Sequence, residues 1–419
     1  MTEVEWKAPA AKQAAVHLST ASDQERKELL KSISSQLLQH ENKILDANEQ
    51  DLQAAKDAGR EDAYLDRLEI NKERLAELAE AVASVSKLDD PLGTTIRSWT
   101  RPNGLFIREV SVPIGVIAAV FEARPNVTAD ISALALRTGN AVLLRGSRSA
   151  IHTNKAITAA LQDGLQAASF PREAVQLIES PDRSATTELM EASDWVDVLI
   201  PRGGKELINK VVRESHVPVI ETGAGNCHVY IDKDADPELA RKIAVDAKVQ
   251  RPSVCNACET ILVEASWAED HLPALIDSLL NHGVSLRGCE KTAAIDNRVS
   301  PAQKEDWEAE YLNLTAAVKI VSDVREACTH INQWGTKHSE AIITESEKAK
   351  LTFFQSVDAS TLYHNASTRF TDGFEFGFGA EVGISTQKLH ARGPMGLQAL
   401  TTVKYLVEGS GQCKGTLPY

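Results

Sequence analysis

Val116-Ile117-Ala118-Ala119-Val120-Phe121 is a continuous apolar run, and it decides the fold class. A strand with one face in water alternates apolar and polar residues, whereas an unbroken run is typical of a strand buried on both faces of a sheet. A helix is predicted next, from about Thr128 to Arg137, with Gly139 as its C-terminal stop. A buried strand followed by a helix indicates a parallel α/β sheet.

The same alternation continues along the chain. The other predicted strands of this kind are short and apolar, and they lie at 141–144, 175–178, 196–200, 229–231 and 260–263. The predicted helices between or after them lie near 150–168, 236–249 and 268–281. Crossovers in such a sheet are right-handed, and ligands bind at the strand ends. Because the pattern restarts past about Gly225, two α/β domains are expected.

Two regions depart from this alternation. Residues 11–90 are predicted to be helical, with a capping box at 22–25 ahead of leucines at helical spacing. Two β-rich runs at 94–100 and 105–112 flank the turn Arg101-Pro102-Asn103-Gly104 and predict a hairpin. Its polar composition favours a hairpin that projects from the body of the protein. The tail at 401–407 is predicted to be one more strand.

The composition is that of an acidic globular protein. The 419 residues carry a formal charge of −14, which argues against a nucleic-acid partner or an anionic membrane surface. The chain starts without the apolar core of a signal peptide, and no stretch approaches the roughly 20 apolar residues of a membrane span. Six scattered cysteines do not predict a disulfide framework. A reduced, cytoplasmic protein is expected.

Three short motifs resemble known sites only in part. Residues 223–228 begin like a dinucleotide-binding fingerprint but lack its third glycine. Residues 201–205 resemble a P-loop, but Glu206 stands where the serine or threonine of that motif would bind magnesium. Cys255-Asn256-Ala257-Cys258 has no second cysteine pair to complete a zinc site, and its flanks are wrong for a redox pair. A single nucleophilic cysteine is favoured, and no metal is predicted.

Several segments follow one another in a characteristic order. They are 122–126, 145–149, 221–226 and Cys255, which lies 255 − 221 = 34 residues after Glu221. This order and spacing resemble the aldehyde dehydrogenase superfamily, and 310–313 and 376–379 resemble its later segments. Five longer segments resemble the branch of this superfamily that reduces glutamyl phosphate. These segments are 121–126, 221–228, 365–373, 379–386 and 392–397. The chain departs from that branch at Cys328 and Trp334.

The resemblance implies an architecture. It predicts an aldehyde dehydrogenase-like α/β fold with two Rossmann-like α/β domains and a projecting β-hairpin that serves as an oligomerisation element. The predicted domains are 1–225 for cofactor binding with the hairpin 94–112 as its arm, 226–385 for catalysis with Cys255, and 386–419 as a return to the cofactor domain and an oligomerisation strand.

The resemblance also assigns catalytic roles. Cys255 is the predicted nucleophile, because a thiolate attacks activated acyl groups and leaves readily from a thioester. Taken alone, a single cysteine is as often a buried apolar residue. Asn126 is predicted to stabilise the oxyanion, although an asparagine after a proline can also simply satisfy its own turn. Glu221 is assigned either proton transfer or a structural role. Cys227 and Cys258 are expected to pack, with an oxidised pair between Cys255 and Cys258 left open.

A nicotinamide cofactor, NADPH or NADP, is implied as well. The residues predicted to bind it are Arg145, Ser147, Arg148, Gly203, Gly204 and Glu310. Arg148 stands where NAD-preferring members tend to carry glutamate, and a guanidinium can bind a 2′-phosphate that a carboxylate would repel. The alternative is that both arginines are solvated surface residues. Glu310 is predicted to hold the nicotinamide ribose, with a solvated helix end as its alternative.

The implied reaction reduces L-glutamyl 5-phosphate to L-glutamate 5-semialdehyde and phosphate, in proline biosynthesis. Candidates for holding the substrate anions are Arg124, Arg251, His228, His330 and His338. A homo-oligomer and a transient association with glutamate 5-kinase are predicted. Two rivals remain: a hydrolytic aldehyde dehydrogenase with Glu221 as the base, and a non-catalytic α/β protein that binds a nucleotide or a partner.

Overall fold

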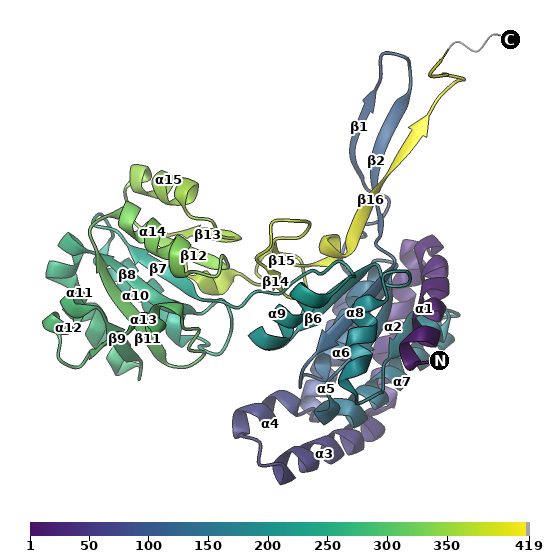
Figure 1. The fold of residues 1–419 in the computed structure, drawn as a ribbon, viewed down its shortest axis with the longest axis horizontal. Coiled ribbons are helices and arrows are strands. Elements are labelled where there is room, and N and C mark those ends of the chain that lie inside the picture. The colour runs from purple at the N-terminus through teal and green to yellow at the C-terminus, as the bar shows by residue number, and fades with distance from the viewer. Residues whose placement is uncertain (416–419) are drawn as a thin grey trace. The chain divides into compact units, whose positions relative to one another are not determined.

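The computed structural model describes residues 1–415, apart from the side chains of Ala63 and Lys205. The chain divides into two compact units (Figure 1). Unit 1 comprises residues 1–221, 378–382 and 395–415, and unit 2 comprises residues 222–377 and 383–394. Each unit has its own parallel sheet, which confirms the predicted α/β class. The cofactor-binding and catalytic roles of the predicted domains stay predictions.

The sheet of unit 1 has four parallel strands in the order β5-β4-β3-β6. The strands are β3 (Val116–Phe121), β4 (Ala141–Arg145), β5 (Val175–Leu177) and β6 (Val198–Arg202). All six residues of β3 are buried, as the apolar run predicts. Gly139 has a φ of 70° and ends the helix before β4, because a residue with a Cβ is strained in this left-handed conformation.

The helices of unit 1 pack on this sheet or on one another (Figure 1). They are α1 (Glu3–Thr20), α2 (Asp23–Gln39), α3 (Glu41–Asp57), α4 (Asp62–Leu68), α5 (Lys72–Val85), α6 (Asn126–Arg137), α7 (Ile151–Ala167), α8 (Arg183–Glu191) and α9 (Lys205–Glu214). The predicted capping box at Ser22 and Glu25 begins α2. Gly164 lets α2 and α7 pack closely, since a Cβ there would lie 2.7 Å from the Cα of Ile33.

The predicted hairpin and tail strand form a separate antiparallel sheet in unit 1. Its order is β1-β2-β16, with β1 at Thr95–Thr100, β2 at Phe106–Pro113 and β16 at Thr401–Glu408. The tail strand pairs with β2 along its full length, from Thr401 opposite Pro113 to Glu408 opposite Phe106. Figure 1 shows these strands extending beyond the helices of the same unit. Most side chains of β1 and β16 are exposed.

Unit 2 is built on a seven-stranded parallel sheet in the order β10-β9-β11-β8-β7-β12-β13. The strands are β7 (Cys227–Ile231), β8 (Cys258–Glu264), β9 (Ser285–Gly288), β10 (Ser300–Pro301), β11 (Thr315–Val321), β12 (Ser339–Ile343) and β13 (Thr361–His364). Every residue of β7, β8 and β12 is buried, so these strands form the centre of the core.

The helices of unit 2 cover this sheet (Figure 1). They are α10 (Pro237–Val249), α11 (Ala265–Asn281), α12 (Glu290–Ile295), α13 (Lys304–Glu308), α14 (Val324–Trp334) and α15 (Glu347–Ser356). A short antiparallel pair joins β14 (Ile384–Ser385) to β15 (Gly393–Pro394). Short 3-10 helices lie at Arg148–Ala150 and Arg172–Ala174 in unit 1, Thr368–Phe370 in unit 2 and Leu397–Leu400 in unit 1. Within residues 1–415, no helix combines the length and the apolar composition that crossing a bilayer requires.

Candidate active site

Cys255 lies in unit 2, in the connection between α10 and β8, and is half-buried. The segment before β7 is packed directly against its backbone. The Cys227 thiol donates to the Cys255 carbonyl oxygen at 3.2 Å, and a Cβ on Gly225 would lie 1.4 Å from the same oxygen. Any side chain at residue 225 would therefore displace the Cys255 loop. The glycine that resembled part of a dinucleotide fingerprint instead permits this contact.

Exposure distinguishes Cys255 from the two neighbouring thiols. Cys227 and Cys258 are both completely buried. Burial raises the pKa of the Cys227 thiol well above its ordinary value and raises the pKa of Cys258 to about 12. Both therefore stay protonated near neutral pH and are poor nucleophiles. This agrees with the packing role predicted for them.

A cation that sequence reasoning did not assign lies near Cys255. The pKa of the Arg369 guanidinium is lowered, first by burial and then by Arg251, while Cys255 acts in the opposite direction. Arg369 is held in place because Asn256 donates its side-chain amide to the carbonyl oxygens of Arg369, at 3.1 Å, and Thr371, at 2.9 Å. Arg251 is exposed and Arg369 half-exposed, so this pair can meet an anion. Arg369 belongs to the segment 365–373, which is one of those that carry the family resemblance. Nothing else in the sequence pointed to a role for this arginine.

Glu310 shares unit 2 with Cys255 and holds the same loop. Its Oε1 accepts a hydrogen bond from the Gly225 backbone N–H at 2.7 Å. The adjacent Asn226 is buried and donates its side-chain amide to the carbonyl oxygens of Trp307, at 2.8 Å, and Trp334, at 2.9 Å. Glu310 therefore acts on the Cys255 loop in this structure, and its predicted contact with the nicotinamide ribose stays a prediction.

The three candidate histidines lie in the interior of unit 2. His228 and His338 are completely buried and His330 is 3% exposed. His228 Nδ1 lies 3.0 Å from a carboxylate oxygen of the buried Glu340. Burial lowers the pKa of His330 to about 3 and that of His338 to about 4, so both are neutral near pH 7. A neutral imidazole adds no positive charge to the binding of an anion, so the contacts of His330 and His338 with substrate anions stay predictions. The spacing of histidines in a sequence does not reveal their burial.

Asn126 lies in unit 1, where it is the first residue of α6. Its side-chain amide donates to Asp130 Oδ2, one helical turn further on, at 2.9 Å. Burial raises the pKa of Asp130 to about 6, although Asn126 and Arg202 act in the opposite direction. Since an amide nitrogen carries two hydrogens, one remains to stabilise an oxyanion. The i, i+4 spacing is the sequence signal that could have identified Asp130.

The end of β4 and the loop after it bring three of the six predicted cofactor residues together in unit 1. Arg145 donates to the carbonyl oxygens of Gly146, at 2.6 Å, and Asp182, at 3.2 Å. Ser147 Oγ lies 2.8 Å from Ser149 Oγ, which lies 2.6 Å from the hydroxyl of Tyr64 on α4. The side chain of Arg148 is exposed.

Two further arginines accompany this loop. The guanidinium carbons of Arg60 and Arg67 lie 5.0 and 6.0 Å from the ring centroid of Tyr64. Tyr64 thus connects α4 to the hydroxyl chain of the β4 loop. Arg60 and Arg67 were not singled out in the sequence, because more than 75 residues separate them from Arg145. The resulting set of guanidinium and hydroxyl donors suits a ligand with phosphate groups.

Gly203 and Gly204 follow β6, at the N-terminus of α9. The Gly204 N–H donates to Glu122 Oε2 at 2.8 Å, and a Cβ on Gly203 would lie 2.7 Å from that oxygen. A carboxylate therefore occupies the donor that a phosphate would use at this helix start. Arg124 is exposed in the loop between β3 and α6, and Glu221 is the last residue of the first segment of unit 1.

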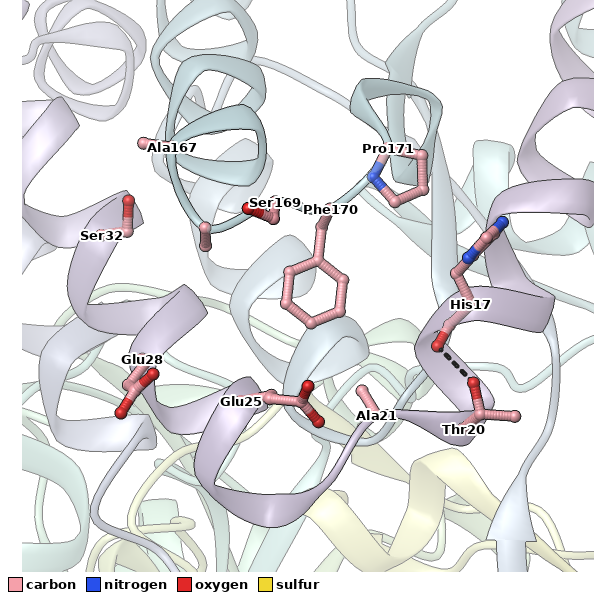
Figure 2. A pocket seen from close by; sticks show the side chains of 11 residues that line it. His17, Thr20, Ala21, Glu25, Glu28, Ser32, Ala167, Ser169, Phe170 and Pro171 are labelled. Atoms are coloured by element: carbon pink, nitrogen blue, oxygen red, sulfur yellow. Dashed lines mark hydrogen bonds between the residues drawn. The ribbon is translucent and has the colours of Figure 1, made fainter.

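A cavity of about 450 Å³ lies in unit 1, where the ends of α1 and α7 meet the start of α2 (Figure 2). Its lining includes the carboxylates of Glu25 and Glu28 beside the ring of Phe170. Glu25 is already engaged, because its Oε2 accepts hydrogen bonds from Ser22 N and Oγ at 2.7 Å. Two carboxylates beside two negative helix ends repel anions, so this cavity does not suit a phosphorylated substrate.

Residues 2–297 match the model of the aldehyde dehydrogenase family. The chain belongs to this family, whose members use a nicotinamide cofactor. Among its relatives are gamma-glutamyl phosphate reductases, and the one of Halalkalibacterium halodurans is 54% identical over 415 residues, which is 99% of this chain and 100% of the relative. The predicted resemblance is thereby confirmed.

Solved structures of gamma-glutamyl phosphate reductases are also similar to this chain. The gamma-glutamyl phosphate reductase of Thermotoga maritima is 44% identical and superposes with a TM-score of 0.97, covering 99% of this chain and 100% of that one. The enzyme of Saccharomyces cerevisiae is 28% identical with a TM-score of 0.55, covering all of both chains. These matches confirm the predicted aldehyde dehydrogenase-like fold.

Proposed function

We propose that the chain reduces L-glutamyl 5-phosphate to L-glutamate 5-semialdehyde and phosphate, as a step of proline biosynthesis, with NADPH as reductant and Cys255 as nucleophile. The observation that carries this proposal is the half-exposed Cys255, held by Gly225 and Cys227 in a chain whose full-length relatives are named for this substrate. The alternative of a non-catalytic α/β protein explains neither the half-exposed Cys255 loop nor the full-length similarity to gamma-glutamyl phosphate reductases.

The first step falls to Cys255. Its sulfur attacks the acyl carbon, the bond from that carbon to the phosphate oxygen breaks, and phosphate leaves with the bonding electrons. The product is a thioester on Cys255. When bound, NADPH would supply a hydride to the acyl carbon, and loss of the Cys255 thiolate from that carbon would release the aldehyde. No water enters this sequence, so Glu221 is not needed as a base.

Arg251 and Arg369 supply the positive charge for the first step. Arg369 interacts electrostatically with Arg251, which lowers the pKa of Arg369, and with Cys255, which raises it. Guanidinium groups bind phosphate through paired hydrogen bonds, and nearby positive charge favours the thiolate over the thiol. We infer that these residues, rather than the buried histidines, hold the substrate anions. Arg124 remains a candidate, and the oxyanion role of Asn126 stays a prediction.

The donors of the β4 loop favour NADPH over NADH. Arg148 is exposed there, with Arg145, Arg60 and Arg67 on neighbouring segments and the hydroxyl of Ser147 beside them. This donor set fits phosphate oxygens, including a 2′-phosphate. One buried nitrogen, Nε of Arg145, has no hydrogen-bond partner in the part of the chain that the structure describes. We therefore assign recognition of the adenosine phosphates to this loop.

Assembly into a homo-oligomer through the β1-β2-β16 sheet belongs to the proposal. Val403, Tyr405 and Val407 of β16 are 40%, 51% and 55% exposed, and alternate residues of a strand share one face. A sheet with exposed apolar side chains is typical of an interface with another chain. A transient association with glutamate 5-kinase, which would limit loss of an unstable acyl phosphate, stays a prediction.

The reverse reaction tests the proposal. NADP reduction is measured with glutamate 5-semialdehyde, with and without phosphate, for the wild type and for Cys255→Ala. We expect strict dependence on phosphate and no turnover in the variant, with Cys258→Ala retaining activity as a matched cysteine control. Phosphate-independent oxidation would instead mean that water resolves the thioester, and the assignment would move to a hydrolytic dehydrogenase with Glu221 as the base.

A further inference from the structure

Unit 2 has a second cavity, of about 460 Å³, formed by α13, β11 and α14. Its walls present Lys304 and Trp307 from α13, Lys319 from β11, and His330 and Trp334 from α14. None of the described residues that line it is acidic. In a chain with a formal charge of −14, a cavity with two lysines and no carboxylate of its own favours an anionic ligand.

His330 lines this cavity and carries a hydrogen-bond donor without a partner among the described residues. Lys319 Nζ lies 3.3 Å from His330 Nδ1, and an ammonium can only donate, so Nδ1 accepts and the ring hydrogen is on Nε2. His330 is 3% exposed, and Nε2 has no hydrogen-bond partner among residues 1–415. A buried donor without a partner is unfavourable, so His330 has hydrogen-bonding capacity that the described residues leave unused.

The charge of the two lysines is only partly neutralised. Lys319 Nζ lies 3.6 Å from a carboxylate oxygen of Glu326, which is half in solvent. Lys304 is exposed, and its Nζ lies 5.9 Å from the ring centroid of Trp334. At this distance the ammonium contacts the indole without being paired to a carboxylate. Both lysines can therefore turn toward an anion in the cavity.

The two indoles define the remainder of the ligand. Trp307 and Trp334 are half-buried, and their ring centroids lie 5.4 and 6.4 Å from that of His330. Indole faces beside cations are the surfaces on which nucleobases stack. The volume also lies within the range of small-molecule sites. A planar base carrying one phosphate combines the two properties that this cavity offers.

The cavity is connected to the Cys255 loop. Asn226 donates to the carbonyl oxygens of Trp307 and Trp334, one in each of two walls. Its neighbours Gly225 and Cys227 contact the carbonyl oxygen of Cys255. A ligand that shifts α13 against the end of α14 therefore changes the hydrogen bonds that hold this loop.

We propose that this cavity is a regulatory site for a nucleoside monophosphate, whose phosphate is bound by Lys304, Lys319 and His330 and whose base stacks on the indoles. The site is separate from the proposed catalytic chemistry, and its occupancy can be measured without substrate.

The test is calorimetric titration of the full chain with AMP, beside adenosine and inorganic phosphate alone. We expect AMP to bind more tightly than either part. The double variant Lys304→Gln/Lys319→Gln should lose about tenfold or more in AMP affinity, because charge-assisted hydrogen bonds are removed. The equally charged control Lys242→Gln/Lys291→Gln, at exposed positions elsewhere in unit 2, should bind as the wild type does.

Arg148→Gln distinguishes this cavity from the proposed cofactor loop in unit 1. Retained AMP binding in Arg148→Gln supports the proposal, and AMP should also change the rate at which iodoacetamide alkylates Cys255. Equal AMP affinity in the Lys304/Lys319 variant, loss of binding in Arg148→Gln, or phosphate binding as tightly as AMP would overturn the nucleotide site. An unchanged alkylation rate at saturating AMP would overturn its coupling to Cys255.

Discussion

Gly225 shows how much depends on one absent side chain. A Cβ at residue 225 would lie 1.4 Å from the Cys255 carbonyl oxygen, so Gly225→Ala must displace the Cys255 loop. We expect its kcat/KM to fall by about 100-fold or more, because small displacements of reacting groups have effects of this size. Steady-state kinetics check this, with Gly415→Ala, which meets no atom within 4 Å, as the control. Activity within a few-fold of wild type would contradict the close approach.

Asp130 predicts a pH dependence of stability. Its pKa is raised to about 6 by burial, so the folded state binds more protons than the unfolded state between the ordinary pKa and that value. Its contribution to stability is therefore most favourable at low pH and declines as the pH rises through about 6. We expect Asp130→Asn to gain stability relative to wild type more at pH 8 than at pH 4.5.

Thermal unfolding at the two pH values measures this difference. Asp46→Asn, at an exposed position of α3, serves as the control and should show no such change. An Asp130→Asn difference that is the same at both pH values would show that Asp130 titrates normally. Activity is a separate readout, because Asp130 also holds the amide of Asn126.

At the scale of elements, a buried ion pair joins α10 to β8. Lys248 and Glu259 are both completely buried and contact each other, and Glu259 also accepts from the Leu312 backbone N–H at 3.2 Å. Lys248→Met should lower the free energy of unfolding by about 3–5 kcal/mol, because it leaves a buried carboxylate without its partner. Urea unfolding measures the loss.

The double variant Lys248→Met/Glu259→Gln is the informative companion. It removes both charges, so most of the lost stability should return. Burial raises the pKa of Glu259 to about 7 even beside Lys248, so the carboxylate of the single variant should protonate readily as the pH is lowered. If the double variant were as unstable as the single one, packing rather than charge would explain the loss.

At the scale of the whole molecule, the β1-β2-β16 sheet predicts self-association. Tyr405 and Val407 expose apolar surface on one face of β16. Tyr405→Asp/Val407→Asp should shift the chain toward the monomer, since charges on a buried interface are unfavourable. Light scattering after size exclusion measures the mass. Thr402→Asp, which lies on the opposite face of the strand, is the matched control. A monomeric wild type would contradict the assembly.

The sequence by itself determined the fold class and the family. The apolar run Val116–Phe121 and its repeats predict buried parallel strands, because periodicity and composition are local properties. The order of Asn126, Glu221 and Cys255 identified the family, because spacing along the chain is preserved in the sequence itself. The hairpin at 94–112 followed from a turn and two β-rich runs, and β2 and the tail strand are found paired.

Only the tertiary structure decided which side chains meet. Arg369 interacts with Cys255 although 369 − 255 = 114 residues separate the two in the sequence. Glu122, at the end of another strand, accepts a hydrogen bond from the Gly204 N–H. By residue type His330 could carry a positive charge, yet burial makes it neutral. Contacts and burial arise when distant segments pack together, and neither is encoded in the local pattern around any one residue.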